Sequence, residues 1–371
     1  MYKGILYIAL IISVFSQFLK AQNNNDSLYN EAVLDVYDDP DNAIKTAEKL
    51  FELNEANGKQ QIKALLLASN AYSSKRDYEK SLEYALRSNE INKNLQDPKL
   101  QIEILSKIAA QYHQLGVNDK ALEVLDEADK ESTKIEATDS IRAVLANNNA
   151  IKGFIYRDQL SCDIAITYFD KANQTYFQLK ETRRILANKS VVTYNKGNCL
   201  LTLNQINNAK ENFKRAEAFA QKAGASSLQA FSLKGLAEAY TLEGKYEESL
   251  KTLQEANTLA ENVGDLVLNN GVYRGMANNY LALKDWNNFQ TYKEKGDKVA
   301  QQIINTERST IHKLLESYTQ NTLEKEKKVK RNFGGVILFA LLLLGILFYF
   351  IIKGEISFQK KLKNIKSKIK V

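Results

Sequence analysis

The chain has 371 residues, of which only two are proline and sixteen are glycine. So few helix-breaking residues exclude a turn-rich β fold and favour helices. The net charge of +7 is concentrated near the C-terminus, because residues 353–371 carry +6 and residues 324–331 carry +3, which leaves the rest mildly acidic. Both basic segments flank an apolar stretch, so the charge pattern indicates a membrane and argues against nucleic acid.

Residues 1–21 are predicted to be a secretory signal peptide. An apolar run follows Lys3, and Ala21 is the small residue expected to end the peptide. Lys20 is unusual so close to a cleavage site, which leaves an uncleaved anchor as the alternative. Both interpretations send the following residues across the membrane.

A repeated pattern of two amphipathic helices covers most of the remaining chain. One copy runs from Leu233 to Ala256, with apolar and small residues three and four apart on each side of a break at Gly244. A large residue near the end of each first helix, here called the registering residue, recurs every 40–44 positions: Tyr72, Tyr112, Tyr156, Leu200, Tyr240 and Tyr280. Small residues early in each second helix recur every 38–44 positions, and a large residue replaces them only in the last copy: Ala43, Ser81, Ala121, Ala165, Ala209, Ser249 and then Phe289.

The order of these positions resembles the tetratricopeptide repeat, in which a large residue, Leu-Gly and Tyr precede Ala, Phe and Ala. The resemblance implies an all-α, right-handed superhelical solenoid of helical hairpins, with about seven hairpins over residues 22–304. Because the spacing exceeds the usual ~34 residues, each helix is expected to be longer by about a turn or more. The atypical residues Pro40 and Trp286 fall in the terminal hairpins, where capping is expected.

The solenoid is predicted to continue into a membrane anchor. Residues 305–332 are expected to form a helical stalk. Residues 333–352 contain no charge and are long enough to span about 30 Å as one transmembrane helix. The lysine-rich residues 353–371 then form a basic cytoplasmic tail, which places the repeats in the periplasm, on the bacterial inner membrane. The tail is expected to lie on anionic lipid, with a dimeric signalling helix as the alternative.

Residues that carry chemistry are few. His113 and His312 lack a Cys, Asp or Glu at metal-ligand spacing, so no metal site and no cofactor are expected. Cys162 begins a second helix, and Cys199 lies inside the first helix of the next hairpin. A disulfide and a pair of buried thiols both fit this placement, and buried thiols are favoured. No phosphate loop, nucleophile motif or paired carboxylate is present, so the protein is not expected to be an enzyme.

The resemblance further implies a binding groove on the first helices, at positions six before, two before and one after the registering residue. The candidates at these positions are Asn70, His113, Phe154, Arg157, Tyr194, Asn198, Lys234, Arg274 and Asn278. Three of the candidates are asparagines at the same repeat position. An asparagine amide offers both a donor and an acceptor, which suits an extended peptide backbone. A merely polar groove is the alternative.

The overall order of segments resembles a flavobacterial group of membrane-anchored repeat proteins, a likeness that includes residues 153–157 and 196–199. The resemblance predicts a periplasmic scaffold or sensor that binds a protein or peptide and makes no direct contact with nucleic acid. The alternative is a transmembrane regulator that controls transcription through a cytoplasmic partner. Related chains often continue into a helix-turn-helix or kinase module, whereas this basic segment stops at Val371. A homodimer through the stalk and the transmembrane helix fits both functions.

Overall fold

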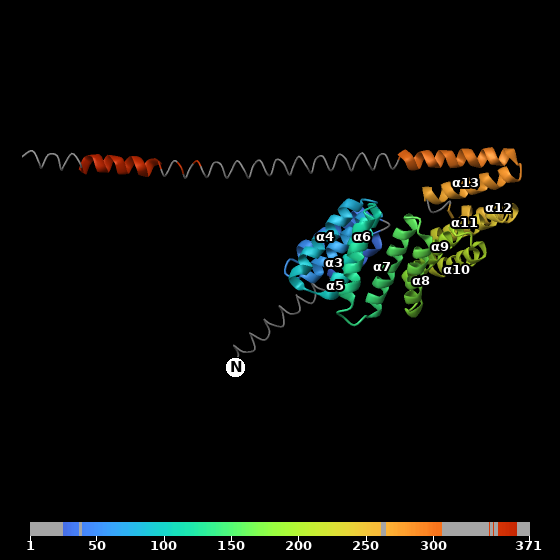
Figure 1. Cartoon of the computed structure of the whole chain (residues 1–371), viewed down its shortest axis with the longest axis horizontal. Coiled ribbons are helices and arrows are strands. Elements are labelled where there is room, and N and C mark those ends of the chain that lie inside the picture. Colours follow the sequence, from blue (N-terminus) through green and yellow to red (C-terminus); the bar gives the residue numbers. More distant parts are fainter. Residues whose placement is uncertain are drawn as a thin grey trace, which may run out of the picture. The chain divides into compact units, whose positions relative to one another are not determined.

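The structure is a computed structural model that describes residues 25–36, 39–260, 265–305, 341, 344 and 348–361. Every regular element within these residues is a helix, which confirms the predicted all-α class. The main run of helices is α2 (Pro40–Leu53), α3 (Gly58–Ser74), α4 (Tyr78–Leu95), α5 (Pro98–Gln114), α6 (Asn118–Ser132), α7 (Asp139–Asp158), α8 (Cys162–Gln178), α9 (Arg183–Thr202), α10 (Ile206–Ala223), α11 (Ser226–Leu242), α12 (Tyr246–Ala260) and α13 (Leu266–Ala282) (Figure 1). Residues 25–36 and 286–305 form helices before and after this run.

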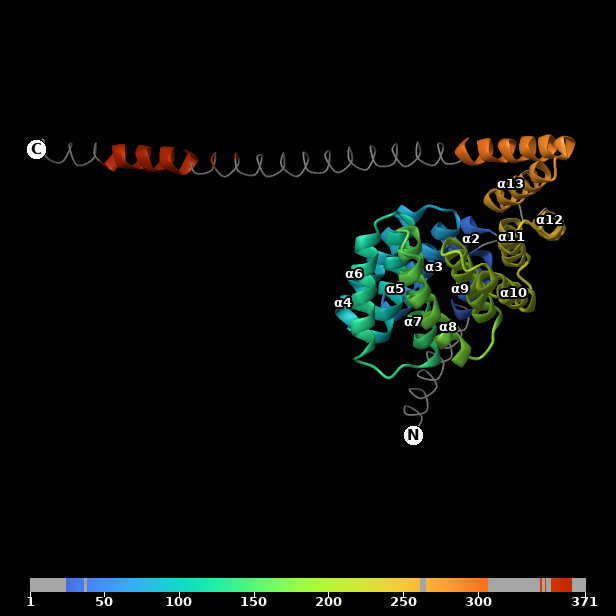
Figure 2. The same cartoon turned by 45° about the vertical axis from the view of Figure 1, so that its right-hand side comes forward.

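The helices of the first compact unit, which ends at Asp297, form two layers. The odd-numbered helices from α3 to α13 each pack against the next odd-numbered helix, and Figures 1 and 2 show α5, α7 and α9 in succession. The even-numbered helices contact only their neighbours in sequence among the described helices. We call the odd-numbered set the inner helices and the even-numbered set the outer helices. This arrangement confirms the predicted solenoid of hairpins, in which a first helix is inner and a second helix is outer.

One turn geometry joins the two helices of six hairpins. The residue four positions after each registering residue has a positive φ of 58–75°: Arg76, Gly116, Leu160, Asn204, Gly244 and Lys284. The next backbone N–H donates to the carbonyl of the registering residue at 2.8–2.9 Å in each hairpin. These features define a Schellman motif, which satisfies carbonyls at the end of the inner helix. Because every turn falls at the same distance from its registering residue, the turns confirm the repeat register.

Small residues allow the two layers to approach each other closely. The predicted small residues Ala43, Ser81, Ala121, Ala165, Ala209 and Ser249 are all 0% exposed. Gly153 of α7 serves the same purpose, because a β-carbon there would lie 2.5 Å from the ring of Phe169 on α8. Burial of the Phe169 ring stabilises the fold by about 1.5–3 kcal/mol. A side chain at residue 153 would displace the ring and reduce this stabilisation.

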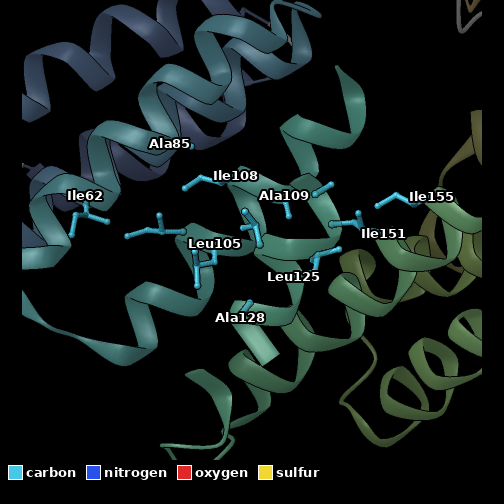
Figure 3. Close-up of a cluster of buried hydrophobic side chains, with 12 residues drawn as sticks. Ile62, Ala85, Leu105, Ile108, Ala109, Leu125, Ala128, Ile151 and Ile155 are labelled. Atoms are coloured by element: carbon cyan, nitrogen blue, oxygen red, sulfur yellow. The ribbon is translucent and has the colours of Figure 1, made fainter. Parts of the chain in front are cut away.

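Each apolar cluster of the core contains residues from more than one hairpin. In Figure 3, Ile62 of α3 and Ala85 of α4 face Leu105 and Ile108 of α5, while Ile155 of α7 extends the cluster. Because each inner helix supplies side chains to its own hairpin and to the preceding one, no hairpin buries its apolar face alone. The core therefore positions the inner helices relative to one another, and with them the predicted groove residues.

Several predicted segments lie outside the described residues. They include the signal peptide at 1–21, the stalk beyond Asn305 and most of the transmembrane helix at 333–352. No helix of the described part is both long and apolar enough to cross a membrane. In the second compact unit, Lys298–Val371, residues 348–361 form a helix whose side chains are all exposed.

Candidate binding groove

The nine predicted groove residues all lie on inner helices, as the repeat register requires. Asn70 is on α3, His113 on α5, Phe154 and Arg157 on α7, Tyr194 and Asn198 on α9, Lys234 on α11, and Arg274 and Asn278 on α13. Asn70, Arg274 and Asn278 are exposed, whereas the other six are half-buried. The structure gathers these residues into separate groups, of which one lines an open groove.

The open groove lies between α11 and α13. It has a volume of about 620 Å³ and brings together three of the predicted residues, Lys234, Arg274 and Asn278. Leu253 of the outer helix α12 also lines it, as do Glu238 and Thr241, which occupy the predicted positions two before and one after Tyr240. The repeat positions did not predict the other lining residues, which are Leu242, Val267, Asn270, Gly271 and Gly275. An open groove with apolar walls and a few convergent polar groups is the expected form of a binding site.

Two glycines one turn apart on α13 leave the space for this groove. A β-carbon at Gly271 would lie 2.9 Å from Cδ of Lys234, and one at Gly275 would lie 3.1 Å from Cδ1 of Leu253. In the preceding hairpin, Phe231 occupies the position that corresponds to Gly271, and the pocket between α9 and α11 has only about 190 Å³. Glycine at residue 271 therefore distinguishes the α11–α13 groove from the smaller α9–α11 pocket. The two glycines four residues apart, Gly271 and Gly275, are the sequence signal that would have located the groove.

The groove carries unpaired charge. Within the described residues, Lys234 and Arg274 have no carboxylate partner, and neither has Glu238. Other lysines of the array are paired: for example, Lys210 of α10 forms an ion pair with Glu243 at the end of α11. Two cations and one anion thus face the groove, and the amide of Asn278 makes no hydrogen bond to another described residue. These groups are available to a ligand.

A second group joins α5, α7 and α9, but its members bind one another. Arg157 donates from Nε to Oδ1 of Asp158 at 2.9 Å and from Nη1 to Oδ1 of Asn195. Nε2 of His113 lies 3.9 Å from Oδ2 of Asp158, and the His113 ring stacks on Phe154 with centroids 6.4 Å apart. The predicted residues His113, Phe154 and Arg157 are therefore brought together. Because the guanidinium already has two partners, a ligand would have to compete for it.

The remaining predicted residues are dispersed. Tyr194 packs its ring against Phe213 and Phe231, with centroids 5.8 and 5.9 Å apart. The amides of Asn70 and Asn198 have no hydrogen-bond partner among the described residues, but neither residue lines the α11–α13 groove. Of the three asparagines at this repeat position, only Asn278 lines the α11–α13 groove.

Asn257 lies in the second helix of its hairpin, so the repeat register predicts that its side chain is on the outer surface, and this prediction is wrong. Asn257 of α12 is only 8% exposed. An outer helix packs against its own inner helix and against the inner helix of the next hairpin, so a wide face of it is covered. Asn94 of the outer helix α4 is an asparagine that does lie on the exposed surface.

Burial shifts the pKa of several charged groups that the sequence did not single out. Burial alone would lower the pKa of Lys152 on α7, but hydrogen bonds to Asp126 and Asp129 at 2.7 and 2.8 Å outweigh burial and raise it. Lys107 of α5 has no such partner among the described residues, and burial lowers its pKa to about 8. No group of three or more His, Cys, Asp or Glu side chains in the described part of the chain could hold a metal ion.

Comparison with known proteins supports the helical-repeat fold. Residues 192–222, which contain the end of α9 and most of α10, match the family model for the tetratricopeptide repeat. No curated protein matches the chain in sequence. Similar solved structures include the apo form of RapI, which is 14% identical over 75% of this chain and 77% of that chain, with a TM-score of 0.57.

Two further structures are similar in fold. One is a signal transduction ATPase with numerous domains and a tetratricopeptide repeat sensor, from Pyrococcus horikoshii, with 14% identity over 78% of this chain and 44% of that chain and a TM-score of 0.57. The other is a Rap protein complexed with competence and sporulation factor, with 14% identity over 76% of this chain and 88% of that chain and a TM-score of 0.50. At these identities the likeness shows the fold alone.

Proposed function

We propose that this protein is a scaffold that binds an extended segment of another protein in the groove between α11 and α13. The observation that carries the proposal is the pair of unpaired cations, Lys234 and Arg274, on opposite walls of a groove of about 620 Å³. Their charge favours a segment with acidic side chains, because a charged hydrogen bond is worth about 1.5–3 kcal/mol. Asn278 adds an amide that can pair with the backbone of the segment.

The form of the groove favours a polypeptide over a small molecule. The groove is open, it is lined by two inner helices, and its polar groups are spread over successive turns of α13 at residues 270, 274 and 278. An extended chain can reach all of these turns, whereas a small ligand would leave some of the polar groups unused. The complex of a Rap protein with competence and sporulation factor offers a precedent for ligand binding on this fold. The proposal includes binding and no catalysis.

The proposed location of the scaffold is the periplasmic side of a bacterial inner membrane. The support comes from the sequence: an apolar leader at 1–21, an uncharged stretch at 333–352 and a lysine-rich tail at 353–371. The helix at 348–361 adds exposed apolar side chains followed by Lys360 and Lys361, a composition suited to an anionic lipid surface. Dimerisation through residues 305–352 is a further part of this proposal.

Site-specific photo-crosslinking in cells tests the binding site. A photoreactive amino acid at Val267, which lines the groove and is 51% exposed, should give one defined crosslinked adduct. The matched control is the same amino acid at the exposed Lys251 of the outer helix α12, which should give no such adduct. Adducts at Lys251 but not at Val267 would move the site to the outer helices.

Protease protection tests the location separately. Protease added to spheroplasts should degrade the repeats and leave a reporter fused after Val371 intact. Repeats that remain protected while the spheroplasts are intact would contradict a periplasmic scaffold, whatever the crosslinking shows.

A further inference from the structure

The two cysteines of the chain lie on α8 and α9, which belong to consecutive hairpins and pack against each other. Cys162 is the first residue of the outer helix α8, and Cys199 lies near the end of the next inner helix, α9. Corresponding pairs in the other hairpins are Tyr78 with Gln111, Asn118 with Ile155, Ile206 with Ala239 and Tyr246 with Asn279. These pairs mix polar, apolar and aromatic residues. Only the pair on α8 and α9 consists of two thiols, and the chain contains no other cysteine.

Both thiols are buried in the same cluster of the core. Cys162 is 5% exposed and Cys199 is 0% exposed, and both belong to the cluster that contains Ala165 and Phe169. The pKa of the Cys199 thiol is raised first by burial and then by a hydrogen bond to the Cys162 thiol. Both cysteines are free in the structure. The sequence placed them at different points of their own hairpins, but the contact between consecutive hairpins brings them together.

We propose that Cys162 and Cys199 are a built-in disulfide site, which an external disulfide oxidant converts to a bond between α8 and α9. In the first step the Cys162 thiolate attacks the oxidant, breaks its S–S bond and releases one thiol. Cys199 then attacks the Cys162 sulfur and releases the second thiol. One S–S bond is broken and one is formed, and two electrons and two protons pass from the cysteines to the oxidant.

The bond would fix one hairpin to the next. It would close a loop that contains the whole of α8 and most of α9, and constraint of such a loop lowers the entropy of the unfolded chain. Because both thiols are buried, the bond should form while the chain folds, or after the first turn of α8 opens. The inference is independent of partner binding in the α11–α13 groove.

The test compares the full-length protein in detergent after refolding with oxidised or with reduced glutathione. We expect the oxidised sample to be lighter by about 2 Da, since two hydrogen atoms are lost, and to offer no thiol to maleimide in guanidinium. Its melting temperature should rise and should return to the reduced value with dithiothreitol. Cys162→Ser and Cys199→Ser should show no shift in melting temperature between the two conditions.

Three results would overturn the proposal. They are a mixed disulfide with glutathione at one cysteine, a disulfide-linked dimer, and two thiols that still react with maleimide after oxidative refolding. All three are read on the wild-type protein, so the test remains decisive even if a serine variant does not fold.

Discussion

Gly235 of α11 lies directly against the ring of Phe213 on α10, since a β-carbon at residue 235 would stand 2.5 Å from Cε1 of that ring. Gly197 of α9 meets the same ring from its own hairpin, at 2.6 Å by the same measure. Phe213 is 0% exposed, so its ring fills the space between two consecutive inner helices. The packing of one hairpin on the next therefore depends on a glycine at each of these positions.

Gly235→Ala should destabilise the protein by about 1–3 kcal/mol, because the ring cannot retreat within a filled core. The exposed Glu238→Ala on the same helix should change the free energy of unfolding by less than about 0.5 kcal/mol. Urea unfolding followed by circular dichroism measures both. Equal midpoints for the two variants would mean that the layers have room to adjust.

The turn at Leu160 offers a stabilising substitution. Leu160 has a φ of 60° and is 86% exposed, so it adopts the left-handed conformation without burying its side chain. That conformation costs a residue with a β-carbon about 1–2 kcal/mol, which glycine avoids. Leu160→Gly should therefore raise the free energy of unfolding by about 1 kcal/mol.

Gly116 provides the matched control, because it occupies the same turn position in the preceding hairpin, with a φ of 75°. Gly116→Ala should lower the free energy of unfolding by about 1 kcal/mol. Thermal melts of the two variants should shift in opposite directions. Shifts in the same direction would be inconsistent with six equivalent turns.

Lys107 should make stability depend on pH in the alkaline range. Burial lowers its pKa from 10.5 to about 8, and it has no ion pair among the described residues. Between these two pH values the unfolded chain binds more protons at this site than the folded chain does. The contribution of Lys107 to the free energy of unfolding is therefore lowest below pH 8 and rises as the pH increases from about 8 to 10.5.

Lys107→Met removes the buried charge and retains an apolar side chain of similar length. It should stabilise the protein at pH 7 by about 1–3 kcal/mol, and the gain should shrink as the pH rises towards 10.5. Urea unfolding of both proteins at pH 7, 8, 9 and 10 gives the difference directly. A difference that stays constant across this series would rule out a neutral lysine in the folded state.

The fold could be predicted because the registering residues fix both helix faces and turns. A residue near the end of each inner helix, such as Tyr112, determines where the turn falls, so the spacing alone predicted six turns. The conformation of Leu160 could not be anticipated from its side chain, because leucine has no preference for a positive φ. It follows instead from equivalence with glycine at residues 116 and 244.

The candidate groove could be predicted only in part. Lys234, Arg274 and Asn278 were found because repeat positions determine which side chains lie on the inner helices. Which other residues line the groove depends on how closely α13 approaches α11. Gly271 and Gly275 determine this distance, because they pack against side chains of the preceding hairpin. Contacts between hairpins also bring together side chains from different repeats, and the pattern within one repeat does not predict these contacts.

Titration of the crosslinked partner tests the central claim that the α11–α13 groove is the binding site. The protein with Lys234→Gln and Arg274→Gln should bind that partner at least about 100-fold more weakly than the protein with Lys251→Gln, since two charged contacts of about 1.5–3 kcal/mol each are lost. Isothermal titration of both variants with the same partner gives the ratio of dissociation constants. Equal dissociation constants would contradict the account and place the partner outside this groove.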